Sequence, residues 1–106
     1  MANSEQLGFR ALADPTRRNI LQLLAHEAMT IGEVAENFQM TRAAVKKHLN
    51  ILDEGNLISV KAKGRSRVNS LNADGLKDVF DWFSYFDRFW DDRLNALKNE
   101  IEKEKS

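Results

Sequence analysis

The sequence predicts a small, mostly α-helical protein that carries one β-hairpin. Apolar residues recur at helical spacing through most of the 106 residues, whereas residues 57–71 alternate polar and apolar side chains at a period of two. A capping residue precedes each of the expected central helices. A chain of this length forms one domain at most, so residues 1–106 are expected to share a single modest core.

The first two helices are predicted to meet at a turn near residue 14. Leu7 lies in an apolar segment that indicates a short N-terminal helix. Asp14 followed by Pro15 predicts a new helix, because Asp is a favoured N-cap and Pro at the first helical position loses no hydrogen bond. This second helix is expected to end near His26, and its apolar residues are Ile20, Leu21, Leu23 and Leu24.

A capping box predicts the third helix. The Thr30 hydroxyl can accept the N–H of Glu33, and the Glu33 side chain can accept the N–H of Thr30. The helix is expected over about 31–38, and the residues it turns inward are Ile31, Val34, Ala35 and Phe38.

Thr41 is expected to cap a fourth helix that runs to about Asp53. Gly55 follows the last turn, where a left-handed residue commonly closes a helix. The apolar face of this helix is formed by Ala44, Val45, Leu49 and Leu52.

The hairpin is predicted from two alternating runs, at about 57–63 and 67–71, around a turn at Gly64. Ile58, Val60 and Ala62 are expected to face the helices, because a two-stranded hairpin of this size must pack on them to be stable. The cations of the hairpin are then expected to face outward: Lys61, Lys63, Arg65 and Arg67.

A long C-terminal helix is predicted over about 74–103, because apolar residues step by three or four along one face. Residues 80–90 contain both tryptophans, the tyrosine and four of the six phenylalanines, more aromatic area than one side of a terminal helix needs. We expect this face to form a dimer seam. The alternatives are a ligand pocket between subunits, formed by Trp82, Tyr85 and Phe89, or ordinary core. The expected seam residues on this helix are Leu76, Val79, Phe83, Phe86, Trp90, Leu94 and Leu97.

Charge is distributed unevenly although the chain has no formal net charge. Residues 41–67 hold seven basic and two acidic side chains, a sum of +5, while residues 1–40 sum to −2 and residues 68–106 to −3. A cationic segment in an otherwise acidic molecule favours a partner that is a polyanion.

The two short helices at about 31–53 form a candidate helix-turn-helix, because the second one is basic and can enter the major groove of double-stranded DNA. The basic hairpin at about 57–71 follows directly and fits the role of a wing that contacts the DNA backbone or the minor groove. The competing interpretations are a merely solvated cationic surface and a winged helix that binds proteins instead of DNA. The candidate DNA-binding residues are Thr41, Arg42, Ala43, Lys46, Lys47, His48, Asn50, Lys61, Lys63, Arg65 and Arg67.

Three segments together resemble the ArsR/SmtB family of winged helix-turn-helix repressors: Ala13 to Leu24, Thr41 to Leu52, and Gly55-Asn-Leu-Ile58. The resemblance covers roughly residues 5–72. It implies a homodimer built from the first and last helices, so that Leu7 of the first helix joins the seam. It also implies binding to an inverted-repeat operator, with Thr41 to Asn50 as the reading helix and Lys61 to Arg67 as the wing.

The sequence departs from the metal-sensing members of that family. Those commonly carry paired cysteines on the bracing helix, where this chain has Ile31 to Glu36, and others carry histidine ligands on the dimer helix, where it has none. Its two histidines, His26 and His48, lie on different elements. We therefore expect no metal and no other cofactor. For His48, half-buried packing and a phosphate contact remain alternatives.

Other function classes find little support in the sequence. It shows no nucleophile–base set and no glycine loop for phosphate, so no enzyme activity is expected. It contains no cysteine, no signal peptide and no apolar run of about 20 residues, which favours a cytoplasmic protein without a membrane span. Whether a small molecule or a protein acts as an inducer stays open.

Overall fold

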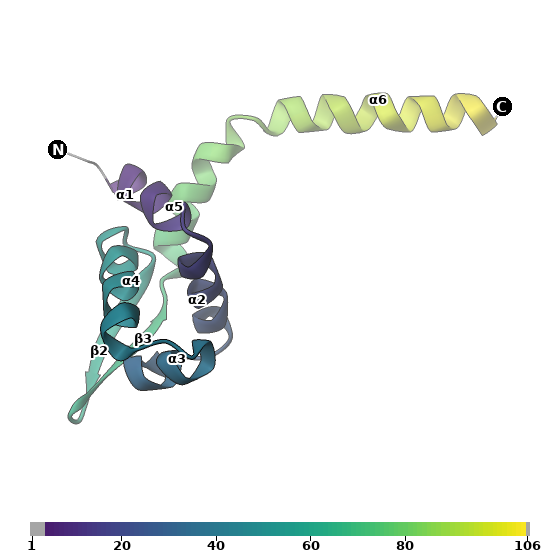
Figure 1. The fold of residues 1–106 in the computed structure, drawn as a ribbon. Coiled ribbons are helices and arrows are strands. Elements are labelled where there is room, and N and C mark those ends of the chain that lie inside the picture. The colour runs from purple at the N-terminus through teal and green to yellow at the C-terminus, as the bar shows by residue number, and fades with distance from the viewer. Residues whose placement is uncertain (1–3, 106) are drawn as a thin grey trace.

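A computed structural model describes residues 4–105 and contains six helices and a three-stranded antiparallel sheet within that range (Figure 1). The predicted fold class, mostly helical with a small hairpin, is confirmed. In chain order the elements are α1 (Ser4–Leu12), α2 (Pro15–His26), β1 (Met29–Thr30), α3 (Ile31–Phe38), α4 (Arg42–Glu54), β2 (Ile58–Lys63), β3 (Ser66–Leu71), α5 (Ala73–Ser84) and α6 (Asp87–Lys105).

The predicted caps are present. The carboxylate of Asp14 accepts the N–H of Arg17 at 2.9 Å, and Pro15 opens α2. At the start of α3 the N–H of Glu33 donates to the Thr30 hydroxyl at 3.2 Å, and the N–H of Thr30 donates to Glu33 Oε1 at 3.0 Å. The Thr30 N–H is the main reason that the pKa of the Glu33 carboxyl lies below its ordinary value. These local hydrogen bonds set where α2 and α3 begin.

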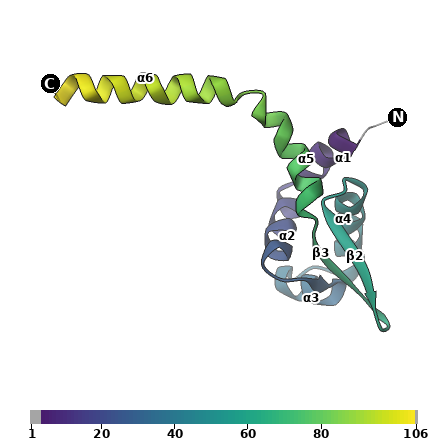
Figure 2. The ribbon, with the colours of Figure 1, turned by 180° about the vertical axis from the view of Figure 1, so that it is seen from behind.

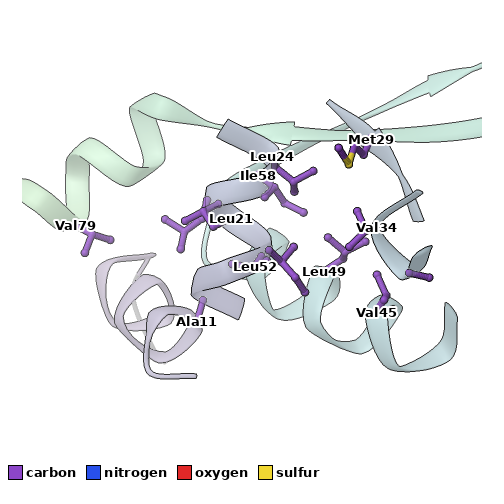
Figure 3. Packing of buried hydrophobic residues seen from close by; sticks show 13 residues of the cluster. Ala11, Leu21, Leu24, Met29, Val34, Val45, Leu49, Leu52, Ile58 and Val79 are labelled. Atoms are coloured by element: carbon purple, nitrogen blue, oxygen red, sulfur yellow. The ribbon is translucent and has the colours of Figure 1, made fainter. Parts of the chain in front are cut away.

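The core lies between α1, α2, α3, α4 and the inner end of the sheet, and α5 closes one side of it (Figure 3). In that close view, Leu21, Val45, Leu49 and Leu52 point into a common interior. The burial of these apolar side chains fixes the short helices relative to one another, since each helix is too short to be stable alone. The largest fully buried side chains are Ile20, Val34, Val45, Leu52 and Leu57.

The sheet has the order β1-β3-β2, and its third strand was not predicted. β1 is only two residues long and pairs Met29 with Asn69 and Thr30 with Val68. The side chain of Asn69 is buried and donates to the carbonyl of Met29 at 3.2 Å. This hydrogen bond ties the base of the hairpin to the segment that opens α3.

The hairpin is confirmed, and Ile58, Val60 and Ala62 share the sheet face of the buried Asn69, as expected, but the helices do not cover Val60 and Ala62. Only Ile58 of the three is buried; Val60 is 40% exposed and Ala62 is also exposed. Figures 1 and 2 show the reason: β2 and β3 extend beyond α3 and α4, so the outer half of the hairpin has no helix to cover it.

The C-terminal helix is not continuous as predicted but is divided into α5 and α6. At the end of α5 the N–H groups of Tyr85 and Phe86 donate to carbonyls three residues back, those of Trp82 and Phe83, at 3.3 and 2.9 Å. The last turn thus tightens, and α6 starts in a new direction. Neither glycine nor proline marks the break, so the sequence held no signal for it.

Val79 was expected at the dimer seam, and the structure corrects this: its side chain is only 3% exposed and belongs to the protomer core. It packs beside Gly8 of α1, at a place where a Cβ on Gly8 would come within 2.5 Å of Val79 Cγ2. The absence of a side chain at Gly8 therefore lets α1 and α5 approach closely.

Gly55 was expected to take a left-handed conformation, and this is also wrong. Its φ is −78°, and the neighbouring Asn56 takes the positive value of 61°. Glycine is needed at this position for another reason: α1 approaches so closely that a Cβ on Gly55 would lie 2.9 Å from the carbonyl oxygen of Leu7.

α6 extends away from the rest of the molecule (Figures 1 and 2). The radius of gyration is accordingly 18.7 Å, compared with about 13 Å for a compact chain of this length. Every side chain described from residue 80 to residue 104 is exposed. No helix within residues 4–105 has both the length and the apolar character that a bilayer crossing requires.

Candidate nucleic-acid interface

The candidate interface is centred on α4, whose start is fixed by Thr41. The N–H of Ala44 donates to the Thr41 hydroxyl at 3.1 Å, so this hydroxyl caps the helix while its own hydrogen can still be donated elsewhere. Val45, Leu49 and Leu52 are buried and anchor the helix against the core. The capped N-terminus and one face of α4 are thereby held at the surface.

The predicted α4 residues share that exposed face. An α-helix turns by about 100° per residue, which places Arg42, Lys46, Asn50, Ala43 and Lys47 side by side within less than half of the circumference. All five are exposed. The face carries cationic side chains and one amide, which can hydrogen-bond to base edges, and a methyl group that can contact thymine.

A cleft of about 660 Å³ lies between α4 and the hairpin, and we call it the α4–hairpin cleft. Its cations come from both elements: two from α4 and two from the end of the hairpin. One carboxylate, that of Asp53, also lines it. The lining residues are Thr30, Ile31, Gly32, Arg42, Lys46, Leu49, Asn50, Asp53, Val60, Arg65, Ser66, Arg67 and Asn69.

The strand register divides the four hairpin cations into two groups. Ala62 pairs with Arg67 and Val60 with Asn69, so Arg67 lies on the same sheet face as the buried Asn69, toward α4. Lys61 and Lys63 alternate with these residues and lie on the opposite face. The structure therefore brings Arg65 and Arg67 together with α4 and leaves Lys61 and Lys63 apart from the cleft.

Arg42 is positioned by a close contact with α3. A Cβ on Gly32 would lie 2.8 Å from Nη2 and 3.1 Å from Cζ of Arg42. The guanidinium thus rests on the first turn of α3, over a residue that has no side chain. Gly32 was not among the predicted site residues, because the contact joins two helices and no local pattern records it.

His48 is separated from this interface. It is half-buried, does not line the α4–hairpin cleft, and its Nδ1 is buried without a hydrogen-bond partner among the described residues. The backbone N–H of Arg17 is the main cause of the lowered pKa of Asp14, and the charges of Arg17 and His48 lower it further. Because an α-helix turns by about 100° per residue, His48 also lies about 100° or more around α4 from each of the five residues of the exposed face.

The described residues contain no group of three or more His, Cys, Asp or Glu side chains arranged to hold a metal ion.

Comparisons with known proteins agree with this geometry. Residues 12–61 match the family described as "Helix-turn-helix domain". The chain is 42% identical over 78 residues to the transcriptional repressor SdpR of Bacillus subtilis, covering 74% of this chain and 87% of that protein. It is 35% identical over 101 residues to the HTH-type transcriptional regulator Rv2034 of Mycobacterium tuberculosis, covering 95% of this chain and 92% of that protein.

A solved structure also matches most of the chain. The ArsR-like transcriptional regulator from Rhodococcus sp. RHA1 has a TM-score of 0.73 and 28% identity, and the match covers 91% of each chain. The capped basic helix, the adjoining hairpin and these relatives lead to one conclusion. The chain belongs to the ArsR family of winged helix-turn-helix transcriptional regulators, which bind DNA.

Proposed function

We propose that this protein is a dimeric repressor that binds an inverted-repeat operator. The observation that carries the proposal is the α4–hairpin cleft, in which Arg42 and Lys46 of α4 stand opposite Arg65 and Arg67 of the hairpin. Four cations and one carboxylate give this surface a charge of +3 in a chain that is neutral overall. Such a surface attracts the phosphate backbone and releases its counterions.

We assign α4 to the major groove. Arg42 and Lys46 can donate to guanine or phosphate, Asn50 can pair with adenine, and the Ala43 methyl can contact a thymine methyl. Arg65 and Arg67 then reach the backbone or the minor groove beside it. Lys61, Lys63 and Lys47 have a smaller role, as distant phosphate contacts, and His48 has none.

A dimer is proposed because α5 and α6 leave apolar side chains uncovered. Phe83 is 50% exposed, Trp90 60% and Leu94 62%. Contiguous apolar surface of this kind commonly marks a protein interface. A two-fold axis would present two α4 helices to half-sites one helical turn, about 34 Å, or a multiple of it apart. The proposed ligand is genomic DNA, so we place the protein in the cytoplasm.

The division of the hairpin cations gives a test with a matched control. Arg67→Ala is expected to weaken operator binding by about tenfold or more, because it removes a cation from both half-sites. Lys61→Ala removes the same charge from the opposite sheet face and is expected to change affinity by less than about threefold. Fluorescence anisotropy with a labelled operator duplex measures both. Equal losses would show that the outer face of the hairpin contacts DNA, against this assignment.

The contact between Gly32 and Arg42 gives a second test. Gly32→Ala is expected to lower operator affinity without unfolding, because alanine favours the helix by up to about 1 kcal/mol but displaces the guanidinium. The double variant Gly32→Ala/Arg42→Ala is expected to bind no worse than Arg42→Ala alone. The same anisotropy assay measures this cycle. If the two losses add, Gly32 acts independently of Arg42 and the positioning role is wrong.

A further inference from the structure

A negative charge lies within the otherwise cationic α4–hairpin cleft. Of the lining residues within residues 4–105, Asp53 alone carries a carboxylate, and it is exposed. It follows Lys46 by seven residues and Asn50 by three, which places all three within about 60° of one another around α4. The surface assigned to DNA therefore presents an anion on the same stripe as its cations.

The protomer does not explain this charge by stability. Within the described range, no ion pair or hydrogen bond involves the carboxylate of Asp53. The neighbouring Glu54 differs, because its Oε2 lies 3.9 Å from Nη1 of Arg10 on α1. Asp53 also lies in the last turn of α4, where the helix dipole disfavours an anion. The role of Asp53 is therefore to be sought in what enters the cleft.

The chemistry of a carboxylate limits what it can face in DNA. An ionised carboxylate accepts hydrogen bonds and donates none, so it repels phosphate and pairs with an amino group. In the major groove cytosine presents its N4 amino group, which Asp can accept from. Guanine and thymine present acceptors there, and adenine places its N7 acceptor beside its amino group. A carboxylate that enters the groove without an amino partner loses water and gains nothing in return.

We propose that Asp53 is a specificity-determining residue, whose carboxylate accepts a hydrogen bond from the N4 amino group of one cytosine in each half-site. On DNA without that cytosine, the carboxylate stays unpaired and opposes the attraction between the four cleft cations and phosphate. Asp53 thereby lowers the affinity for unrelated DNA more than the affinity for the operator. Selective binding commonly combines attraction with repulsion in this way. The inference rests on the proposed function, because it requires α4 to enter the major groove.

The test compares two neutralised carboxylates that are adjacent in the sequence. Asp53→Asn removes the charge at nearly constant size, and Glu54→Gln is the matched control, because Glu54 carries the same charge but does not line the cleft. Anisotropy titrations of the full chain use two duplexes, one with the sequence that the wild type selects and one of unrelated sequence. The measured quantity is the ratio of the two affinities.

For Asp53→Asn this ratio is expected to fall by about tenfold, with tighter binding to the unrelated duplex and a steeper salt dependence. For Glu54→Gln it is expected to stay within about twofold of the wild type. Selection from a randomised DNA pool locates the contact: the wild type is expected to enrich cytosine at one position of each half-site, and Asp53→Asn is expected to lose that preference alone. Thermal melting followed by circular dichroism is expected to show no loss of stability in Asp53→Asn.

An unchanged ratio in Asp53→Asn overturns the proposal even if both affinities rise, because Asp53 would then merely offset a neighbouring cation. An equal fall in Glu54→Gln, a retained cytosine preference or a lowered melting temperature also overturns it. In each of these cases a wild type that still selects one inverted repeat leaves the proposed function intact. A wild type that selects no shared sequence overturns both.

Discussion

The double variant Arg42→Ala/Lys46→Ala is expected to lose operator binding by about 100-fold or more while it keeps its fold. Both side chains line the α4–hairpin cleft from α4, and both are exposed, so their removal leaves no cavity in the core. Each contact is worth about 1–3 kcal/mol and occurs in both half-sites of a dimer. The loss should therefore exceed that of any hairpin variant. Anisotropy titrations at several salt concentrations measure it.

A matched control removes two cations elsewhere. Lys77→Ala/Arg88→Ala changes the net charge by the same amount but on α5 and α6. Lys77 pairs with Asp81 at 3.1 Å on an exposed face, and such a pair contributes little to stability. This control is expected to bind nearly as the wild type does, with the same salt dependence. If the control loses as much affinity as the α4 variant, bulk charge and not the cleft governs binding.

The double variant Leu94→Glu/Leu97→Glu is expected to convert the protein to a monomer that binds the operator at least about 100-fold more weakly. In the protomer both side chains are more than half exposed, so the changes cost the single chain little. In a dimer they place four unpaired charges at the apolar seam, which is strongly unfavourable. When the dimer is lost, operator binding weakens as well, because the second half-site no longer contributes an effectively intramolecular contact.

Its control places the same two glutamates on other faces of the same helix. Asn95 and Asn99 lie more than about 100° around α6 from the midpoint between Leu94 and Leu97, so Asn95→Glu/Asn99→Glu alters a face away from the seam. This variant is expected to remain dimeric. Light scattering with an inline sizing column separates the outcomes. A dimeric Leu94→Glu/Leu97→Glu protein would place the subunit contact elsewhere than on α6.

The features that the sequence predicted well are those set by local hydrogen bonds and periodicity. Pro15 and the Thr30–Glu33 capping box mark helix starts by contacts within one turn, and Thr41 does the same for α4. The buried face of α4 follows from spacing alone, so the residues on its exposed face follow as well. Spacing therefore predicted which α4 residues are exposed, whereas His48, also a candidate, is half-buried and lies apart from them.

The features that it missed depend on contacts between distant segments. The pairing of β1 with β3 joins residues 40 positions apart, and Asn69 gives no sign of its partner. Val60 alternates like a core residue, but its exposure depends on how far the hairpin extends beyond α3 and α4. Lys61 and Arg67 lie on opposite faces of the sheet, and predicting this requires the strand register and the position of α4. Neither can be read from the local sequence.

Val79 and the division of the last helix show the same limit. Val79 belongs to the apolar stripe of the C-terminal segment, yet Gly8 on α1 makes room for it in the core. The helix changes direction at Tyr85 and Phe86, where neither glycine nor proline marks a break. Spacing along a helix identifies an apolar face, but it does not tell which part of that face packs within the protomer and which part stays exposed in it.

The most direct test is selection of bound duplexes from a randomised DNA pool, carried out in parallel with the wild type and with Arg42→Ala/Lys46→Ala. Wild-type protein is expected to enrich duplexes that share one inverted repeat, and the variant is expected to enrich none. Recovery of the same repeat by the variant, or of no shared symmetric sequence by the wild type, would contradict a paired cationic surface formed by α4 and the hairpin.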